Sequence, residues 1–296
     1  MRALSRSFIV AVMETVNLRE RMLAGVEART SVLDIDGIAT AVTEIGDGPP
    51  VILLHGGIEC GGAMWAPVLA QLAKTYRVVV PDVPGLGESA PASGLDVDTF
   101  ADWLQGVVSQ TGLDRPTLVA HSLVGSLAAR YAAARSDVIG RLVISAAPAV
   151  GPYRMPFHLR YVAIRFAIRP TLRNAERFDR FALLDVDATR QRDAGWFDAF
   201  VDYTRARARI PHVKHTMREL IASQTKPIAD CELERITVPT TLLWGRHDRM
   251  VPLSVGEAAA ARHGWPLRVI DHAAHAPHIE QPEAFVETLT EIGAIA

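Results

Sequence analysis

Runs of apolar residues alternate with stretches of helical periodicity along most of the chain. Short continuous apolar runs bounded by glycine, proline or polar residues are typical of strands buried on both faces of a sheet. The runs that predict strands are GIATAVTEI, PVILLHGG, RVVVPDV, PTLVAH, GRLVISAA, PTTLLWG and PLRVIDHA. Helical spacing between them, as in AMWAPVLAQLAKTY and VDTFADWLQGVVSQTG, predicts a doubly wound, mostly parallel α/β sheet with helices on both faces.

The alternation of strands and helices stops between about residues 151 and 230. This segment contains helical stretches, RYVAIRFAI and WFDAFVDYTRARA, but no run that predicts a strand. It therefore predicts an inserted helical lid. The chain then divides into an N-terminal extension (1–30), a first part of the core (31–150), the lid (151–230) and a second part of the core (231–296). The lid carries 15 Lys and Arg against 9 Asp and Glu, which fits either solvated helix faces or a positive roof over acidic or lipid-like substrates.

Composition and charge exclude several classes of protein. The 31 Lys and Arg nearly balance the 33 Asp and Glu, so nothing in the net charge favours nucleic acid as a partner. Cys60 and Cys231 are too few for a disulfide framework, and we expect both to be buried free thiols. The first 21 residues imitate a signal peptide, but their apolar run FIVAVM is short and lacks a cleavage motif. We expect a cytoplasmic protein without stable membrane insertion, and the sequence leaves its oligomeric state open.

Ser122 lies between the strand PTLVAH and the helix LVGSLAARYAA. A serine on such a turn is strained, and its hydroxyl is lifted above the carboxyl edge of the sheet. The N–H of Leu123, at the start of the helix, points to the same space and can stabilise an oxyanion. Gly57 or Ile58, in LLHGGIECGGAMW, can give a second N–H. The alternative role for Ser122 is an ordinary helix N-cap.

A serine nucleophile needs a base, and a base needs a carboxylate that orients it. His275 follows the last predicted strand in VIDHAAHAPHIEQPEAF, on the same sheet edge as Ser122. His121, His272 and His278 are weaker candidates, and alternation along the strand turns His121 away from Ser122. Asp248 follows the penultimate predicted strand, and Asp271 is its alternative.

The candidate substrate-binding residues are aromatic residues of the lid, which can line an apolar pocket or form the core of the lid: Tyr161, Phe166, Trp196 and Phe197. No glycine-rich loop is placed for a nucleotide, and the three C-terminal histidines lack convergent Cys or Glu partners for a metal. We therefore expect a small-molecule substrate and no cofactor.

Four motifs in fixed order resemble the α/β-hydrolase family from about residue 30 onward: His55-Gly56-Gly57, Pro84-Gly85-Leu86-Gly87-Glu88-Ser89, the Ser122 turn, and Asp248 followed by His275. The resemblance implies a catalytic triad of Ser122, Asp248 and His275. It also implies hydrolysis of a carboxylic ester or lactone through an acyl-enzyme, without a cofactor. The alternatives with the same triad are C–C bond hydrolysis, acyl transfer and perhydrolysis, and a non-catalytic ligand-binding homologue is the alternative from another class.

Two residues depart from the family pattern. Val124 stands where the turn commonly has a small residue, and we expect it to crowd Ala120 and strain the turn. Ala276 stands where relatives that cleave C–C bonds in ring-fission products commonly have Trp, which disfavours that chemistry. Ser122 itself disfavours haloalkane dehalogenases and epoxide hydrolases, which have Asp at this turn.

Overall fold

The computed structural model describes residues 17–135 and 137–292. Its centre is an eight-stranded sheet in the order β1-β2-β4-β3-β5-β6-β7-β8. The strands are β1 (Arg29–Ile35), β2 (Ile38–Ile45), β3 (Pro50–Leu54), β4 (Arg77–Pro81), β5 (Thr117–His121), β6 (Arg141–Ser145), β7 (Thr240–Gly245) and β8 (Leu267–Ile270). β3 to β8 are parallel to one another, whereas β2 pairs antiparallel with both β1 and β4. The predicted mostly parallel α/β sheet is confirmed.

The sequence pattern missed β1, the strand at one edge of the sheet. Its residues RTSVLDI are mostly exposed or half-buried, so they lack the apolar run that marks the central strands. β1 and β2 are joined by Asp36 and Gly37, with φ of 50° and 83°. Positive φ at both central residues is the geometry of a two-residue hairpin turn, for which Asp-Gly is a preferred sequence.

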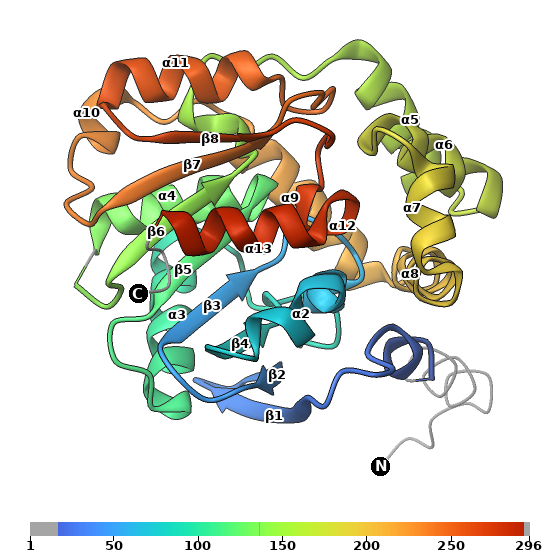
Figure 1. Ribbon diagram of the computed structural model, residues 1–296, viewed down its shortest axis with the longest axis horizontal. Helices are drawn as coiled ribbons and strands as arrows, with labels where there is room; N and C mark the ends of the chain where they lie inside the picture. Colours follow the sequence, from blue (N-terminus) through green and yellow to red (C-terminus); the bar gives the residue numbers. More distant parts are fainter. Residues whose placement is uncertain (1–16, 136, 293–296) are drawn as a thin grey trace.

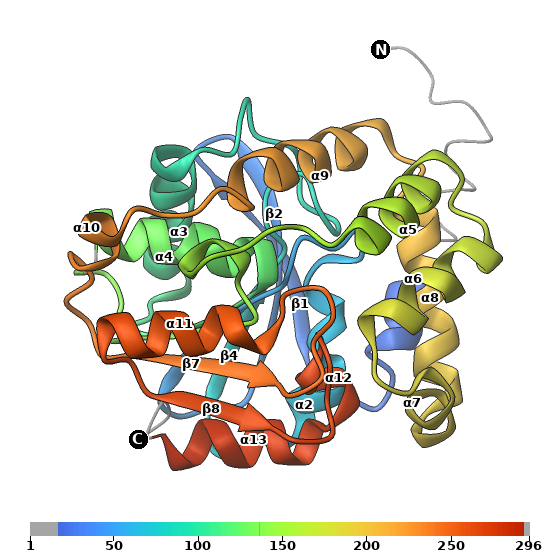
Figure 2. The ribbon, with the colours of Figure 1, turned by 90° about the horizontal axis from the view of Figure 1, so that it is seen from above.

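Helices cover both faces of the sheet (Figures 1 and 2). The helices packed on one face are α3 (Val97–Thr111), α4 (Ser122–Ala134), α9 (Pro211–Gln224), α10 (Asp230–Leu233) and α11 (Leu253–His263). Those packed on the other face are η1 (Gly61–Trp65), α2 (Ala66–Leu72), α12 (Pro277–Glu280) and α13 (Pro282–Glu291). Alternate strand residues feed the two layers: Ile52 and Leu54 belong to one apolar cluster, and Val51 and Leu53 belong to the other.

Residues 151–230 contain no strand, as their pattern predicts. Four inserted helices lie beyond the carboxyl ends of the parallel strands (Figures 1 and 2): α5 (Phe157–Ile168), α6 (Leu172–Ala182), α7 (Val186–Arg192) and α8 (Ala194–Arg207). The fifth helix of the segment, α9, packs instead against α4, because Val213 and Leu220 are buried in the core beneath it.

The turn from β5 into α4 is tight, and Gly125 makes its closest approach to the strand. A Cβ added to Gly125 would lie 2.9 Å from the carbonyl oxygen of Ala120 and 3.1 Å from Cβ of Ala147. Val124 is fully buried in the apolar core. The close approach that the structure shows falls one residue later, at Gly125, and the expectation that Val124 crowds the turn stays a prediction.

Two further features bear on the sequence expectations. Cys60 is a buried free thiol, but Cys231 is exposed on the short helix α10, so the expectation of two buried thiols is wrong for Cys231.

Among the helices of residues 17–292 that the structure describes, none has the length and apolarity to cross a bilayer. Most of the signal-peptide-like segment lies outside the described residues.

We expect Gly125→Ala to lower the free energy of unfolding by about 1 kcal/mol. The added methyl overpacks a site closed by a backbone oxygen, at about 1–3 kcal/mol, which exceeds the helix propensity gained over glycine. Chemical denaturation measures the change. Gly195→Ala is the matched control, because Gly195 is exposed on α8 and its Cβ would meet only a side-chain oxygen at 3.5 Å. The control should be neutral or stabilising, and equal effects at both positions would refute the close approach.

Candidate active site

Ser122, His275 and Asp248 form one hydrogen-bonded chain at the carboxyl edge of the sheet. Nε2 of His275 lies 2.9 Å from Oγ of Ser122, and Nδ1 lies 2.8 Å from Oδ2 of Asp248. All three residues are buried. Because the carboxylate can only accept, Nδ1–H donates to Asp248, which leaves Nε2 free to accept the serine proton. Ser122 has φ of 54°, a strained left-handed conformation for a residue with a side chain.

The loop after β7 fixes the carboxylate of Asp248, whereas the alternative acid, Asp271, lies outside the site. Oδ1 of Asp248 accepts the N–H groups of Met250 and Val251, at 2.8 and 2.9 Å, so the carboxylate is fixed from both oxygens. Asp271 is exposed and forms an ion pair with Arg246, which keeps its pKa below the usual range through the hydrogen bond and the charge. His272 is also exposed. Neither alternative residue contacts the Ser122–His275–Asp248 chain.

His121 supports the backbone of His275. Alternation along β5 predicts that its side chain points away from that of Ser122. In the structure, Nε2 of the His121 ring lies 2.8 Å from the carbonyl oxygen of His275. Burial, together with His275 and His278, lowers the pKa of His121 well below its ordinary value. The neutral ring therefore donates Nε2–H to that carbonyl. His278 stacks on Trp65 with no hydrogen-bond partner, and burial lowers its pKa to about 3.

Glu280 is a buried carboxylate that the sequence reading did not single out. Its Oε1 accepts the N–H groups on either side of His275, from Ala274 at 2.8 Å and Ala276 at 3.3 Å. Its Oε2 accepts the N–H of Leu184, in the turn after α6, at 2.6 Å. Burial raises its pKa to about 7, against the lowering effect of these three amides. The quoted segment HAPHIEQPEAF contains Glu280, but only the fold reveals that its carboxylate returns to the histidine loop.

The inserted helices also contact the histidine loop directly. The N–H of His275 donates to the carbonyl oxygen of Ala182 on α6, at 3.0 Å. The loop that carries His275 is therefore fixed by β5 through His121, by α12 through Glu280 and by α6. None of these contacts involves the imidazole, which stays available to Ser122.

The glycine loop after β3 lies against the start of α4. A Cβ on Gly57 would lie 2.6 Å from Cδ1 of Leu123, and a Cβ on Gly56 would lie 2.6 Å from Nδ1 of His121. The N–H of Ile58 already donates to the carbonyl of Gly56 at 2.7 Å. Of the two sequence candidates for a second oxyanion donor, the geometry thus favours Gly57. Leu123 lies in the first turn of α4, where backbone N–H groups have no partner within the helix.

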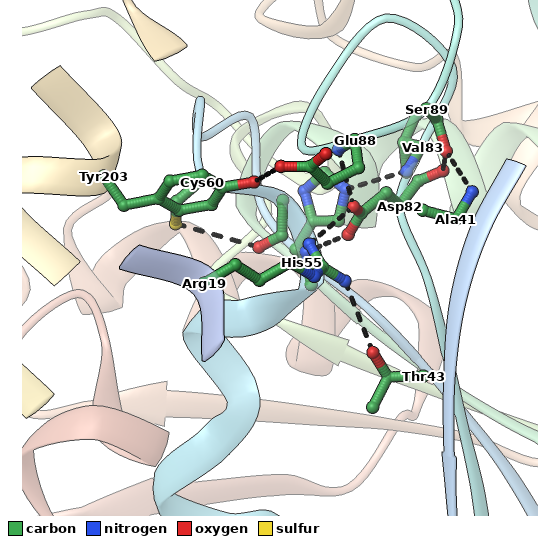
Figure 3. Close-up of polar contacts among 12 residues, drawn as sticks. Arg19, Ala41, Thr43, His55, Cys60, Asp82, Val83, Glu88, Ser89 and Tyr203 are labelled. Atoms are coloured by element: carbon green, nitrogen blue, oxygen red, sulfur yellow. Dashed lines mark hydrogen bonds and ion pairs between the residues drawn. The ribbon is translucent and has the colours of Figure 1, made fainter. Parts of the chain in front are cut away.

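The ring of His55 connects this glycine loop to the turn after β4 (Figure 3). Its Nε2 accepts the N–H of Val83 at 2.9 Å, so Nδ1 carries the proton and donates to the carbonyl of Gly56 at 2.7 Å. Burial lowers the pKa of His55, which keeps the ring neutral. The histidine of the His-Gly-Gly motif therefore connects two loops, and its ring nitrogens bond backbone groups of Gly56 and Val83.

Asp82, at the end of β4, is the centre of the network in Figure 3. Its fully buried carboxylate accepts the N–H groups of Gly62 and Glu88, at 2.6 and 2.8 Å, and pairs with Arg19 at 2.8 Å. Arg19 belongs to the helical turn at residues 17–22, so the described end of the N-terminal extension is tied to the core. Oε1 of Glu88 accepts the hydroxyl of Tyr203 on α8.

The carboxylate of Asp82 explains why the Pro84–Ser89 motif contains Gly87. A Cβ on Gly87, which has φ of 52°, would lie 2.2 Å from Oδ2 of Asp82. Gly61, with φ of 64°, would place a Cβ 2.6 Å from Oδ1. Glycine is therefore required on both sides so that backbone can enclose the carboxylate.

A pocket lies between the glycine loop and the inserted helices. Its lining residues are Ile58, Glu59, Phe166, Ala175, Phe178, Asp179, Phe200, Val201 and Thr204. A second pocket, farther out between α6, α7 and α8, shares Asp179 and Val201 with it and includes Phe197. Ser122 lines neither pocket, and Ile58 is the residue that the inner pocket shares with the glycine loop.

The four aromatic residues predicted to bind substrate separate into two pairs. Phe166 lines the inner pocket and Phe197 the outer one. Trp196 stacks on Phe200, with ring centroids 5.2 Å apart, and belongs to the core of the inserted helices. Tyr161 is exposed on α5. Trp196 and Tyr161 line neither of these two pockets, whereas Phe178 and Phe200 line the inner pocket and were missed.

Two acidic residues, Glu59 and Asp179, line the inner pocket. Burial raises the pKa of Glu59 to about 7. Burial, with the neighbouring charges of Glu176 and Glu59, raises the pKa of Asp179 to about 7. No Lys or Arg is among the residues that line this pocket. Residues 17–135 and 137–292 contain no group of three His, Cys, Asp or Glu side chains arranged to hold a metal ion.

Comparison with known proteins gives the same architecture. Residues 51–288 match the sequence profile described as "Alpha/beta hydrolase family". A 2-hydroxy-6-oxo-2,4-heptadienoate hydrolase from Pseudomonas putida is 27% identical, over 86% of this chain and 92% of that protein. The structure is similar to that of naproxen esterase from Bacillus subtilis, with a TM-score of 0.79, 21% identity and coverage of 98% and 99%. It is also similar to 2-hydroxy-6-oxo-6-phenylhexa-2,4-dienoate hydrolase from Rhodococcus sp. strain RHA1, with a TM-score of 0.76, 21% identity and coverage of 90% and 98%.

We expect Asp82→Asn to lower the free energy of unfolding by about 3–5 kcal/mol, because it leaves the buried guanidinium of Arg19 without its counter-charge. Denaturant titration measures the loss. Asp102→Asn is the control, since Asp102 pairs with Arg135 on the surface and such pairs contribute at most about 1 kcal/mol. A small loss at both positions would contradict the anchoring role of Asp82.

The raised pKa values of Glu59 and Asp179 predict a pH dependence of stability. In the folded protein both carboxyls bind protons up to about pH 7, whereas in the unfolded chain they lose them near pH 4. Folding is therefore most favoured by these groups below about pH 4, and this contribution is lost as the pH rises to about 7. The melting temperature of Glu59→Gln and of Asp179→Asn should fall less than that of the wild type between pH 5 and 8. The exposed Glu257→Gln is the control, and curves parallel to the wild type for the pocket variants would refute the shift.

Proposed function

Because the chain belongs to the α/β-hydrolase family, we propose that it hydrolyses a carboxylic ester or a lactone through an acyl-enzyme on Ser122. The observation that carries this proposal is the hydrogen-bonded chain from Ser122 through His275 to Asp248. A buried serine, a histidine within 2.9 Å and a carboxylate on the far ring nitrogen are the parts that nucleophilic acyl transfer requires.

The first half of the reaction acylates the serine. As Oγ of Ser122 attacks the carbonyl carbon, its proton passes to Nε2 of His275. The negative charge that develops on the carbonyl oxygen is stabilised by the N–H groups of Leu123 and Gly57, aided by the dipole of α4. His275 then gives its proton to the leaving alcohol oxygen as the C–O bond breaks. The acyl group remains bound to Oγ.

The second half of the reaction returns the enzyme to its starting state. His275 takes a proton from water, and the resulting hydroxide oxygen attacks the acyl carbon. When the intermediate collapses, the bond to Oγ breaks and His275 returns the proton to Ser122. Asp248 stabilises the imidazolium in both halves and keeps the proton of the neutral ring on Nδ1.

The inner pocket favours an ester over the substrates of the dienoate relatives. Those relatives are named for dienoates, which bear a carboxylate. Glu59 and Asp179 line the inner pocket of this chain, and no cation accompanies them. A substrate carboxylate placed there would meet like charge above pH 7, whereas the rings of Phe166, Phe178 and Phe200 present apolar surface. Ala276 after His275 favours the same choice.

We expect Ser122→Ala to lose roughly 10⁴- to 10⁶-fold in the rate of p-nitrophenyl ester hydrolysis while its melting temperature stays close to that of the wild type. A fluorophosphonate probe should label the wild type at Ser122 alone, as read by peptide mass spectrometry. Labelling at another serine would overturn the nucleophile. A protein that leaves every ester intact but turns over a vinylogous diketone would be a C–C hydrolase.

We expect Asp248→Asn to lower kcat on the same ester by roughly 10³- to 10⁴-fold, because an amide cannot hold the Nδ1 proton in the same way. His275→Ala should cost at least as much. Asp271→Asn is the matched control, since its carboxylate lies outside the site on Arg246 and its kcat should stay within twofold. A larger loss in the control than in Asp248→Asn would show that the acid is assigned incorrectly.

A further inference from the structure

Helix α5 has two apolar faces, and one of them is exposed. Leu159, Val162 and Phe166 pack against the rest of the protein. On the opposite face, side chains three and four residues apart point to solvent: Phe157, Tyr161, Ile164 and Ile168. Phe157 is 84% exposed and Ile168 is 69% exposed. We name these four residues the outer stripe; it is apolar surface that the described residues leave uncovered.

The outer stripe is concentrated in one place. Of the seven exposed large apolar side chains in the described part of the chain, four belong to the stripe and a fifth, Leu172, begins the next helix. Figures 1 and 2 both show α5 at the periphery of the molecule, away from the sheet. A contiguous exposed apolar surface of this kind marks an interaction site.

The charged residues of the segment that carries the stripe are exclusively basic. From residue 151 to residue 174 the chain has five arginines and no Asp, Glu or Lys. These arginines are all exposed: Arg154, Arg160, Arg165, Arg169 and Arg173. Arg165 lies over the ring of Tyr161, 5.5 Å from its centroid, and none of the five has an acidic partner among the described residues.

We propose that α5 binds the surface of an anionic lipid bilayer. An apolar stripe bordered by arginines is suited to a helix that lies in the plane of the interface, with its apolar side chains among the acyl chains and its guanidinium groups at the phosphates. The occupant is therefore a lipid surface with negative headgroups, and the helix lies on the bilayer without spanning it.

Charge disfavours a second copy of the chain as the occupant. A two-fold symmetric contact places the same surface of both copies together. The five unpaired arginines of one copy would then face the five of the other, with no acidic residue in the segment to offset them. An anionic surface complements both the apolar stripe and its basic border.

The position of α5 connects this surface to the pocket, and this step rests on the proposed function. Phe166, on the buried face of α5, lines the pocket that also includes Ile58 of the glycine loop. The helix that contacts lipid on one side therefore forms a pocket wall on the other. The substrate class that follows is an ester with an acyl chain long enough to reside in a lipid layer.

The test measures binding of the full chain to vesicles in the Ser122→Ala background, so that the result does not depend on turnover. Co-sedimentation compares two kinds of vesicle. One contains phosphatidylcholine with about 30% of the anionic lipid phosphatidylglycerol, and the other contains phosphatidylcholine alone. The variants are Ile164→Ser/Ile168→Ser in the stripe and Arg160→Gln/Arg169→Gln in its border. The controls are Val32→Ser, an equally exposed apolar residue on β1, and Arg235→Gln, an exposed arginine outside the segment.

We expect the parent protein to bind the anionic vesicles at least tenfold more tightly than the neutral ones, roughly the effect of a few arginines at an anionic surface, and more weakly in high salt. Each double variant should lose about tenfold, whereas both controls should bind as the parent does. Unchanged melting temperatures show that the fold is intact. Equal binding by variants and controls, or binding insensitive to lipid charge, would overturn the proposal. So would a dimer in light scattering that Ile164→Ser/Ile168→Ser dissociates, because the stripe would then join two copies.

Discussion

The buried ion pair between Asp82 and Arg19 is the interaction on which the surroundings of Ser122 depend. The same carboxylate accepts N–H groups from the loop after β3 and from the turn after β4. A carboxylate removed from water is stable only when it is paired and fully hydrogen-bonded, so three separate segments must converge on it at once. The loop that carries Gly57 is thereby held in place by a charge that lies outside the reacting groups.

A common rule governs both sides of the serine: contacts to the backbone position the loops and leave the reacting atoms free. Glu280 and His121 bond the main chain of the histidine loop, and His55 bonds the main chain of the glycine loop. Such scaffolding allows the strained φ of Ser122 to persist, because the surrounding structure overdetermines it. It also keeps the N–H groups of Leu123 and Gly57 in a fixed place, which is where preorganised dipoles have the most effect.

Sequence reasoning recovered what leaves a local signal. The central strands are buried on both faces and read as apolar runs, and chain order alone placed Ser122, Asp248 and His275 at one edge. It missed β1, whose edge position permits polar residues, and it assigned α9 to the inserted segment although α9 packs on α4. Glu280 and Arg19 were out of reach because their partners are distant in sequence or are backbone groups. The sequence also could not place Trp196 and Tyr161 relative to the two pockets, since an aromatic residue alone does not reveal which face of its helix meets a pocket.

At the turn around Ser122, the fold needs a small residue where the helix approaches the strand, but that residue does not stand at the position that the family motif specifies. Here the small residue that lets helix meet strand is the third after the serine, and the second is a fully buried valine. A pattern search that demands a small residue two positions after the nucleophile passes over this chain. A search that instead scores the clearance between the strand carbonyl and the first turn of the helix would retain it, along with any other hydrolase that moved its glycine by one residue.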